Sequence, residues 1–166
     1  MLLSFICFSC RKDGKHCEGE ATVFLNGEEW RASSTMNPDA QLDNYFRIKF
    51  LTFDDLGDVE KYLSFSTIPY KVGKYYLYRS NLFIGDSLTT VSLSQYLEGD
   101  QQIGAWGLEE DPDSANYVDI SFYDEWTGEV EGTFNFTLSG RTIFTYERDT
   151  LRFTDGWFEG RICDDD

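Results

Sequence analysis

The sequence predicts an all-β fold, a single antiparallel β-sandwich or closed barrel built from hairpins. Short segments alternate apolar and polar residues with a period of two, the pattern of strands that have one dry and one wet face. Turn-forming residues interrupt these segments about every eight to twelve residues, the spacing of sandwiches and barrels. Aromatic residues make up 17% of the 166 residues and supply enough apolar material for a core.

The first hairpin is indicated by Asn26-Gly27, which lies between the alternating segments Thr22–Leu25 and Glu28–Ala32. Asn-Gly favours the positive φ angles that a type I′ turn requires at both central positions. Trp30, in the second segment, is expected to fill the core or to cover its end.

Two further strands are expected in the middle of the chain, at Tyr45–Phe53 and Tyr62–Ile68. Their apolar residues on one face are Phe46, Ile48, Phe50, Leu63 and Phe65. Ser92–Glu98 is the one segment that could form a brief helix, but its serine and β-branched content disfavours one.

The clearest hairpin joins Tyr117–Tyr123 to the strand that follows the turn at Asp124–Gly128. Gly132 belongs to the inner face of that second strand, so we expect it to make room for a large ring. The inward-facing side chains of the hairpin are expected to be Val118, Ile120, Phe122, Val130, Phe134, Phe136 and Leu138.

Two elements are predicted near the C-terminus. Thr142–Tyr146 is expected to be a short strand. Thr150–Thr154 and Trp157–Ile162 are expected to form the last hairpin, around a turn at Asp155-Gly156.

The first ten residues are almost all apolar or small, and Arg11 begins an abrupt change to polar residues. This pattern resembles a bacterial lipoprotein signal, in which a peptidase cuts before a cysteine that carries acyl chains such as palmitate. Cys10 matches that cysteine, and Ser9 matches the small residue before the cut. The alternative is a buried N-terminal strand that contains two thiols.

The chain is therefore expected to divide into a signal segment (1–9), a polar linker (10–19), a β domain (20–163) and an acidic tail (164–166). Cys17 and Cys163 bracket the strand signals, so a disulfide could close the domain if the chain is exported. Two unpaired thiols are the alternative. A zinc site built from the cysteines and His16 is not expected, because no second paired set of ligands follows.

Three short motifs occur in order along the β domain: Val23-Phe-Leu-Asn-Gly-Glu-Glu-Trp30, Gly128-Glu-Val-Glu-Gly-Thr-Phe-Asn-Phe136 and Phe153-Thr-Asp-Gly-Trp-Phe158. The series resembles a family of uncharacterised, secreted or lipid-anchored β-domain proteins from Bacteroidota. The resemblance implies an extracytoplasmic, outer-membrane-associated β-rich protein, and it carries no catalytic residues over to this chain.

The charge of the chain disfavours nucleic-acid binding. Lys and Arg number 14 and Asp and Glu number 30, which gives a formal net charge of −16. An acidic surface repels phosphates, so it cannot gain affinity by releasing their counterions. No run of eighteen apolar residues occurs, so a membrane-spanning helix is not expected either.

Few residues suit catalysis. The only histidine, His16, lies in the expected linker, where nothing would hold its imidazole against a nucleophile. Two acidic residues could form a glycosidase pair, but a solvated acidic surface is the simpler interpretation. The run Glu109–Asp113 could hold calcium, although Pro112 indicates an exposed turn. No metal and no cofactor is therefore expected.

Exposed aromatic rings are the candidates for ligand binding. Trp126 lies at a predicted hairpin tip, and Tyr75, Tyr76 and Tyr78 occupy both faces of one run, so at least one of them must face outward. Planar rings stack on sugars or anchor protein partners at low cost in conformational entropy. The alternative is that they are ordinary strand residues.

We therefore expect a non-enzymatic domain anchored outside the cytoplasm, at a bacterial outer membrane, by a lipid on Cys10. It would bind a glycan or protein ligand or contribute to a surface assembly, without nucleic acid. One alternative is a carboxylate-dependent glycan hydrolase, which needs a cleft with two carboxyl groups beside Tyr or Trp. The other is a lipocalin-like carrier of an apolar ligand, which needs a large internal cavity.

Overall fold

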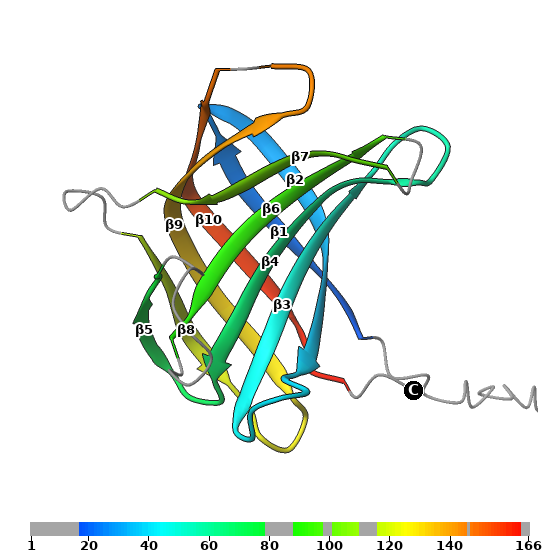
Figure 1. The fold of residues 1–166 in the computed structure, drawn as a ribbon. Helices are drawn as coiled ribbons and strands as arrows, with labels where there is room; N and C mark the ends of the chain where they lie inside the picture. Colours follow the sequence, from blue (N-terminus) through cyan, green and yellow to red (C-terminus); the bar gives the residue numbers. More distant parts are fainter. Residues whose placement is uncertain (1–16, 79–87, 98–100, 110–115, 146, 164–166) are drawn as a thin grey trace, which may run out of the picture.

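The alternating segments form a closed β-barrel (Figure 1). The computed structural model describes residues 17–78, 88–97, 101–109, 116–145 and 147–163. Its strands form one antiparallel sheet in the order β10-β1-β2-β3-β4-β6-β7-β9-β8-β5, and pairing of β9 with β10 closes eight of them into the barrel. The strands are β1 (Glu18–Leu25), β2 (Glu28–Pro38), β3 (Tyr45–Phe53), β4 (Val59–Pro69), β5 (Gly73–Tyr76), β6 (Thr90–Leu97), β7 (Gln101–Leu108), β8 (Tyr117–Tyr123), β9 (Glu129–Thr142) and β10 (Asp149–Arg161).

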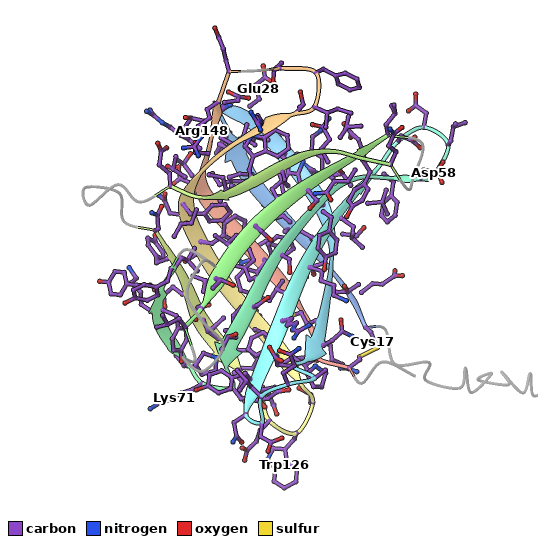
Figure 2. All side chains as sticks on the ribbon, in the orientation of Figure 1. Cys17, Glu28, Asp58, Lys71, Trp126 and Arg148 are labelled. Carbon is purple, nitrogen blue, oxygen red and sulfur yellow. A yellow bond between two sulfur atoms is a disulfide. The ribbon has the colours of Figure 1, made fainter. Side chains whose placement is uncertain are left out.

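The two ends of the barrel differ in the connections that they carry. The β1–β2, β3–β4 and β9–β10 turns lie at the upper end in Figure 1, and the β2–β3, β4–β5 and β8–β9 turns lie at the lower end. Glu28 and Arg148 mark the upper end in Figure 2, and Lys71 and Trp126 mark the lower end.

The expected type of fold is confirmed, and of the two architectures the barrel is the one observed. The first hairpin has the predicted turn, with φ of 52° at Asn26 and 86° at Gly27. The middle strands also lie where the alternation placed them, and Ser92–Glu98 is not helical, because β6 covers all of it that the structure describes.

Phenylalanine rings fill the middle of the barrel. Seven of them, which we call the Phe core, are at most 1% exposed, and all of them except Phe46 make a ring contact with another member. The ring centroids of Phe136 and Phe153 are 4.6 Å apart, and those of Phe50 and Phe134 are 5.4 Å apart. An eight-stranded barrel is just wide enough for side chains to fill, so this part of the interior is a packed core rather than a large cavity. The Phe core consists of Phe46, Phe50, Phe65, Phe134, Phe136, Phe153 and Phe158.

Glycine on the inner wall makes room for these rings. A Cβ added to Gly132 would lie 2.5 Å from Cζ of Phe158, and one added to Gly156 would collide with the ring of Phe134. The expectation for Gly132 is therefore confirmed.

The predicted last hairpin is wrong, because β10 is one continuous strand. It pairs with both β1 and β9, and the register shifts between Phe153 and Gly156 on the β9 side. Asp155 has a φ of 54°, so Asp155-Gly156 forms a β-bulge where the sequence indicated a turn.

Two smaller predictions are also wrong. The register of β8 shifts between Ile120 and Phe122, so Phe122 turns outward and is 42% exposed. The strand expected at Thr142–Tyr146 is not formed: Thr142 ends β9, residues 143–145 belong to a turn, and Tyr146 lies outside the described residues.

A disulfide closes the lower end of the domain. It joins Cys17, just before β1, to Cys163, just after β10, with their Cα atoms 5.7 Å apart (Figure 2). The backbone N–H of Cys163 donates to the carbonyl of Met36 at 3.0 Å, which holds this end of the chain against β2. The sequence left open whether Cys17 and Cys163 form a disulfide or remain thiols, and the structure contains the disulfide.

Candidate functional site

Polar side chains replace apolar ones on the inner face toward the upper end of the barrel. Phe50 pairs with Leu63, and both are buried in the core. Two residues farther along, Thr52 pairs with Lys61, and Lys61 pairs with Gln95 on β6. Because side chains two apart on a strand share a face, these three point inward above the Phe core. With Trp30 and Trp106 they form what we call the upper layer.

Trp30 lies on the inner face because it pairs with Val23, which is buried in the core. Its ring meets Phe153 edge-on, with centroids 6.0 Å apart and planes at 84°. Trp30 therefore covers the upper side of the Phe core. Its indole Nε1 is buried and has no hydrogen-bond partner.

Trp106 lies against the wall of the barrel, where two glycines leave space for it. It pairs with Leu93 and Gly140, and a Cβ on Gly104 or Gly140 would collide with its indole. The side chain is nearly enclosed, since Trp106 is only 6% exposed. Its Nε1 is also buried without a partner.

The unpartnered polar atoms are concentrated in the upper layer. Among the described residues, the buried side-chain nitrogen and oxygen atoms without a partner are Nε1 of Trp30, Oγ1 of Thr52 and Nε1 of Trp106. Leaving such a group unpaired costs about 1–3 kcal/mol, and folded proteins contain few of them. Three at one end of one barrel make this region a candidate binding site.

The lysine of the upper layer has its charge paired with a neighbouring carboxylate. The ammonium group of Lys61 lies 2.7 Å from a carboxylate oxygen of Glu60, and the Lys61 side chain is 26% exposed. The lysine stem thus lines the interior while its charged end reaches the surface, as long amphipathic side chains commonly do.

The rim of the upper end carries several exposed apolar side chains among its charged residues, and it includes an open cleft. Leu56 in the β3–β4 turn is 87% exposed, and Ile143 and Phe144 after β9 are also largely exposed. A cleft of about 530 Å³ lies between β7 and the end of β9, and it includes Gly104, the glycine under the Trp106 ring. Its lining is Gln102, Gly104, Ala105, Arg141, Thr142, Ile143 and Thr145.

A second cleft, of about 480 Å³, lies at the lower end. Three tyrosines dominate its wall, and the rings of Tyr70 and Tyr123 are 5.7 Å apart. We call it the tyrosine cleft. It is lined by Asn44, Tyr45, Pro69, Tyr70, Lys71, Tyr123 and Glu125.

None of the four aromatic residues singled out from the sequence lines the tyrosine cleft. Trp126 lies beside it, at the tip of the β8–β9 turn, and is 92% exposed (Figure 2). Tyr76 and Tyr78 are exposed on the outer surface. Tyr75 is half-buried, its hydroxyl donates to the carbonyl of Lys71 at 2.6 Å, and burial together with the nearby Asp119 carboxylate raises its pKa.

Other candidates from the sequence are not brought together in a site. Glu125 is the only carboxylate that lines the tyrosine cleft, so this cleft lacks the pair that a glycosidase uses. Cys7, Cys10 and His16 lie outside the described residues, as do residues 110–113 of the acidic run.

The upper layer was missed by the sequence interpretation, although one signal for it was present. Thr52 and Gln95 are polar at positions whose spacing from Phe50 and Leu93 marks the inner face. Such a break in the alternation, near the same end of neighbouring strands, indicates a polar region inside a barrel. Whether an indole N–H has a partner depends on three-dimensional packing, which no spacing reveals.

Comparisons with known proteins add no relative: no protein-family model, curated protein or solved structure matches this chain. The part of the chain that the structure describes contains no helix long and apolar enough to cross a membrane.

Proposed function

We propose that this protein is an extracytoplasmic binding protein that holds a small ligand at the mouth of the barrel, against the upper layer and above the packed Phe core. The observation that carries the proposal is the set of buried, unpartnered polar atoms on Trp30, Thr52 and Trp106. The mouth of a β-barrel is a common position for ligand sites, and an eight-stranded barrel can hold one small ligand. The Phe core restricts that ligand to the upper end.

The chemistry of the upper layer defines the class of ligand. An indole N–H can only donate, so Trp30 and Trp106 require a ligand with acceptor atoms. The rings around those donors, and the exposed Ile143 and Phe144 at the rim, favour an apolar body. The ligand proposed is therefore a small apolar molecule that carries a carbonyl or carboxylate oxygen.

The proposed location is outside the cytoplasm, at a bacterial outer membrane, with a lipid on Cys10 as the anchor. The signal-like first ten residues support it, as does the resemblance to lipid-anchored proteins of Bacteroidota. The bridge between Cys17 and Cys163 supports an oxidising compartment, because disulfides persist there. The proposed role is binding without catalysis, and the single carboxylate of the tyrosine cleft gives the hydrolase alternative no support.

The ligand is tested with medium-chain fatty acids, aromatic carboxylic acids and the matching hydrocarbons, which have no acceptor. Binding to the purified full chain is measured by tryptophan fluorescence and by the rise in Tm that a ligand produces. We expect acids to bind and hydrocarbons to bind roughly tenfold more weakly, because each hydrogen bond contributes about 0.5–1.5 kcal/mol. Equal binding of both classes, or no binding, would contradict the proposal.

The anchor is tested separately with Cys10→Ala and with Cys7→Ala as the matched control. In cells given labelled fatty acid, Cys7→Ala is expected to keep the label and remain in the membrane fraction. Cys10→Ala is expected to lose both. Label on Cys10→Ala would show that the assignment of the anchor is wrong.

A further inference from the structure

The tyrosine cleft at the lower end has the composition of a second binding site, separate from the upper layer. Tyr70 directly follows β4 and Tyr123 is the last residue of β8, and their rings lie 5.7 Å apart at 38°. Phe46 stacks on Tyr70 from the core side, with centroids 5.4 Å apart. The two tyrosine rings therefore form a shelf that is supported from beneath.

Polar groups surround this shelf. The amide of Asn44, the ammonium of Lys71 and the carboxylate of Glu125 line the same cleft. The backbone N–H of Tyr70 donates to the carbonyl of Asn44 at 3.2 Å, which joins two walls of the cleft. Burial, with the carboxylates of Glu125 and Asp124, raises the pKa of Tyr123, so its phenol remains a hydrogen-bond donor. The cleft thus combines flat rings with both donors and acceptors.

Trp126 is displayed beside the cleft on a rigid turn. The Asp124 carboxylate accepts the backbone N–H of Trp126 at 2.7 Å and that of Thr127 at 3.1 Å. The N–H of Gly128 donates to the carbonyl of Asp124 at 2.8 Å and closes the turn. The indole is 92% exposed and follows Glu125 directly in the chain. Because the backbone of this turn is already ordered, a ligand that stacks on the ring does not have to order it.

We propose that the tyrosine cleft, with Trp126 at its edge, binds a neutral oligosaccharide. The C–H faces of a sugar ring match the electron-rich faces of tyrosine and tryptophan, and its hydroxyl groups can both donate to Glu125 and accept from Lys71. A neutral sugar is favoured over an acidic one because the carboxylates of Glu125 and Asp124 both act on the Tyr123 side of this cleft.

The experiment uses the purified full chain on an array of neutral and acidic oligosaccharides, followed by calorimetry with the best neutral tetrasaccharide. Trp126→Ala is expected to lower affinity about threefold to tenfold, because it removes a ring at the edge of the cleft on which the sugar would stack. Tyr123→Phe keeps the ring and removes the hydroxyl, and it is expected to cause a smaller loss. Tyr76→Ala, an exposed tyrosine outside the cleft, is the matched control and is expected to bind as the unchanged protein does.

Three results would overturn this proposal. One is the failure of every neutral oligosaccharide to bind, and another is an equal loss in Tyr76→Ala and Trp126→Ala. The third is binding to phosphatidylcholine vesicles in place of any glycan, which would identify the exposed aromatic end as a membrane contact. None of these results bears on the upper layer, because the two sites share no residue and lie at opposite ends of the barrel.

Discussion

Thr52 allows the upper layer to be tested at a single hydroxyl group. Its Oγ1 is buried and unpartnered, so replacing it by a methyl group of similar shape removes a desolvated polar atom without breaking a bond. We expect Thr52→Val to unfold at the same or a higher urea concentration than the unchanged protein. We also expect it to bind an apolar carboxylic acid about three- to tenfold more weakly, as loss of one hydrogen bond implies.

Thr89→Val is the matched control for this change. The Thr89 hydroxyl is buried as well, but it donates to the carbonyl of Thr67 at 2.9 Å. Removing it leaves that carbonyl without this bond, so we expect a loss of about 1 kcal/mol in the free energy of unfolding and no change in ligand binding. A Thr52→Val protein that is destabilised as much as Thr89→Val would contradict the account of the upper layer.

Asp39 should make stability depend on pH in the acid range. Its carboxylate is only 3% exposed and accepts two hydrogen bonds from the Arg47 guanidinium, at 3.0 and 3.1 Å. Burial alone would raise the pKa of Asp39, but the Arg47 bonds and the backbone N–H of Gln41 outweigh it and lower the pKa. The ion pair of Asp39 with Arg47 therefore stabilises the fold at and above about pH 4. This contribution is lost as the pH falls through the lowered pKa of Asp39.

The measurement is urea unfolding between neutral pH and about pH 2 for Asp39→Asn and for Asp43→Asn, a change in the exposed part of the same turn. Asp39→Asn is expected to lose about 1–3 kcal/mol near neutral pH and to approach the unchanged protein at the acid end. Asp43→Asn is expected to follow the unchanged protein throughout. A constant difference at every pH would show that the Asp39 carboxylate charge is not responsible.

The direction of individual side chains is what the sequence predicted best. Phe46, Ile48 and Phe50 were expected on the inner face, and all three are buried. These predictions succeed because successive side chains of a strand point to opposite faces, so that apolar residues two apart in the sequence share one face. The tyrosine cleft could not be found in this way, because Tyr70 and Tyr123 are far apart in the chain and meet only when the barrel closes.

At the scale of whole strands, β-bulges separate the observed fold from the predicted one. A bulge adds one residue to a strand, and every later side chain then changes face, as Phe122 does. Asp155-Gly156 has the composition of a hairpin turn, but a bulge also uses a residue with a positive φ, here Asp155. Whether a turn or a bulge forms at these two residues depends on the neighbouring strands β1 and β9, which are distant in the sequence.

The bulge in β10 gives a prediction at this scale. Asp155 has a φ of 54°, which β-branched residues adopt only at a cost, whereas glycine adopts it freely. We expect Asp155→Val to lower the free energy of unfolding by about 1–2 kcal/mol and Asp155→Gly to change it little. Both are measured by urea unfolding, and a Val variant as stable as the Gly variant would show that the bulge is not fixed at this position.

For the whole molecule, the disulfide holds together a barrel whose last strand pairs with its first. Cys17 and Cys163 are 146 residues apart, so the bridge constrains nearly the whole unfolded chain. We expect the double change Cys17→Ser with Cys163→Ser to lower the free energy of unfolding by about 2–5 kcal/mol. The same protein under reducing conditions should behave like this variant, and a reduced protein of unchanged stability would contradict the prediction.

The two ends of the barrel suit different roles. Cys17 lies at the lower end beside the turn of Trp126, because the N–H of Ile162 donates to the carbonyl of Gly128 at 2.9 Å and Cys163 follows directly. A tether from Cys10 would reach the barrel at this end. The lower end would then face the membrane surface, and the upper layer would point away from it, open to small molecules.

The most direct test of the central claim uses the indole N–H signals of the four tryptophans in an ¹⁵N-labelled protein. Trp30 and Trp106 carry the unpartnered donors of the upper layer, whereas Trp126 lies on the lower turn and Trp157 on β10 is not part of that layer. On addition of an apolar carboxylic acid, the account predicts that the Trp30 and Trp106 signals move and the other two stay in place. Movement of Trp126 or Trp157 alone, with Trp30 and Trp106 unchanged, would contradict it.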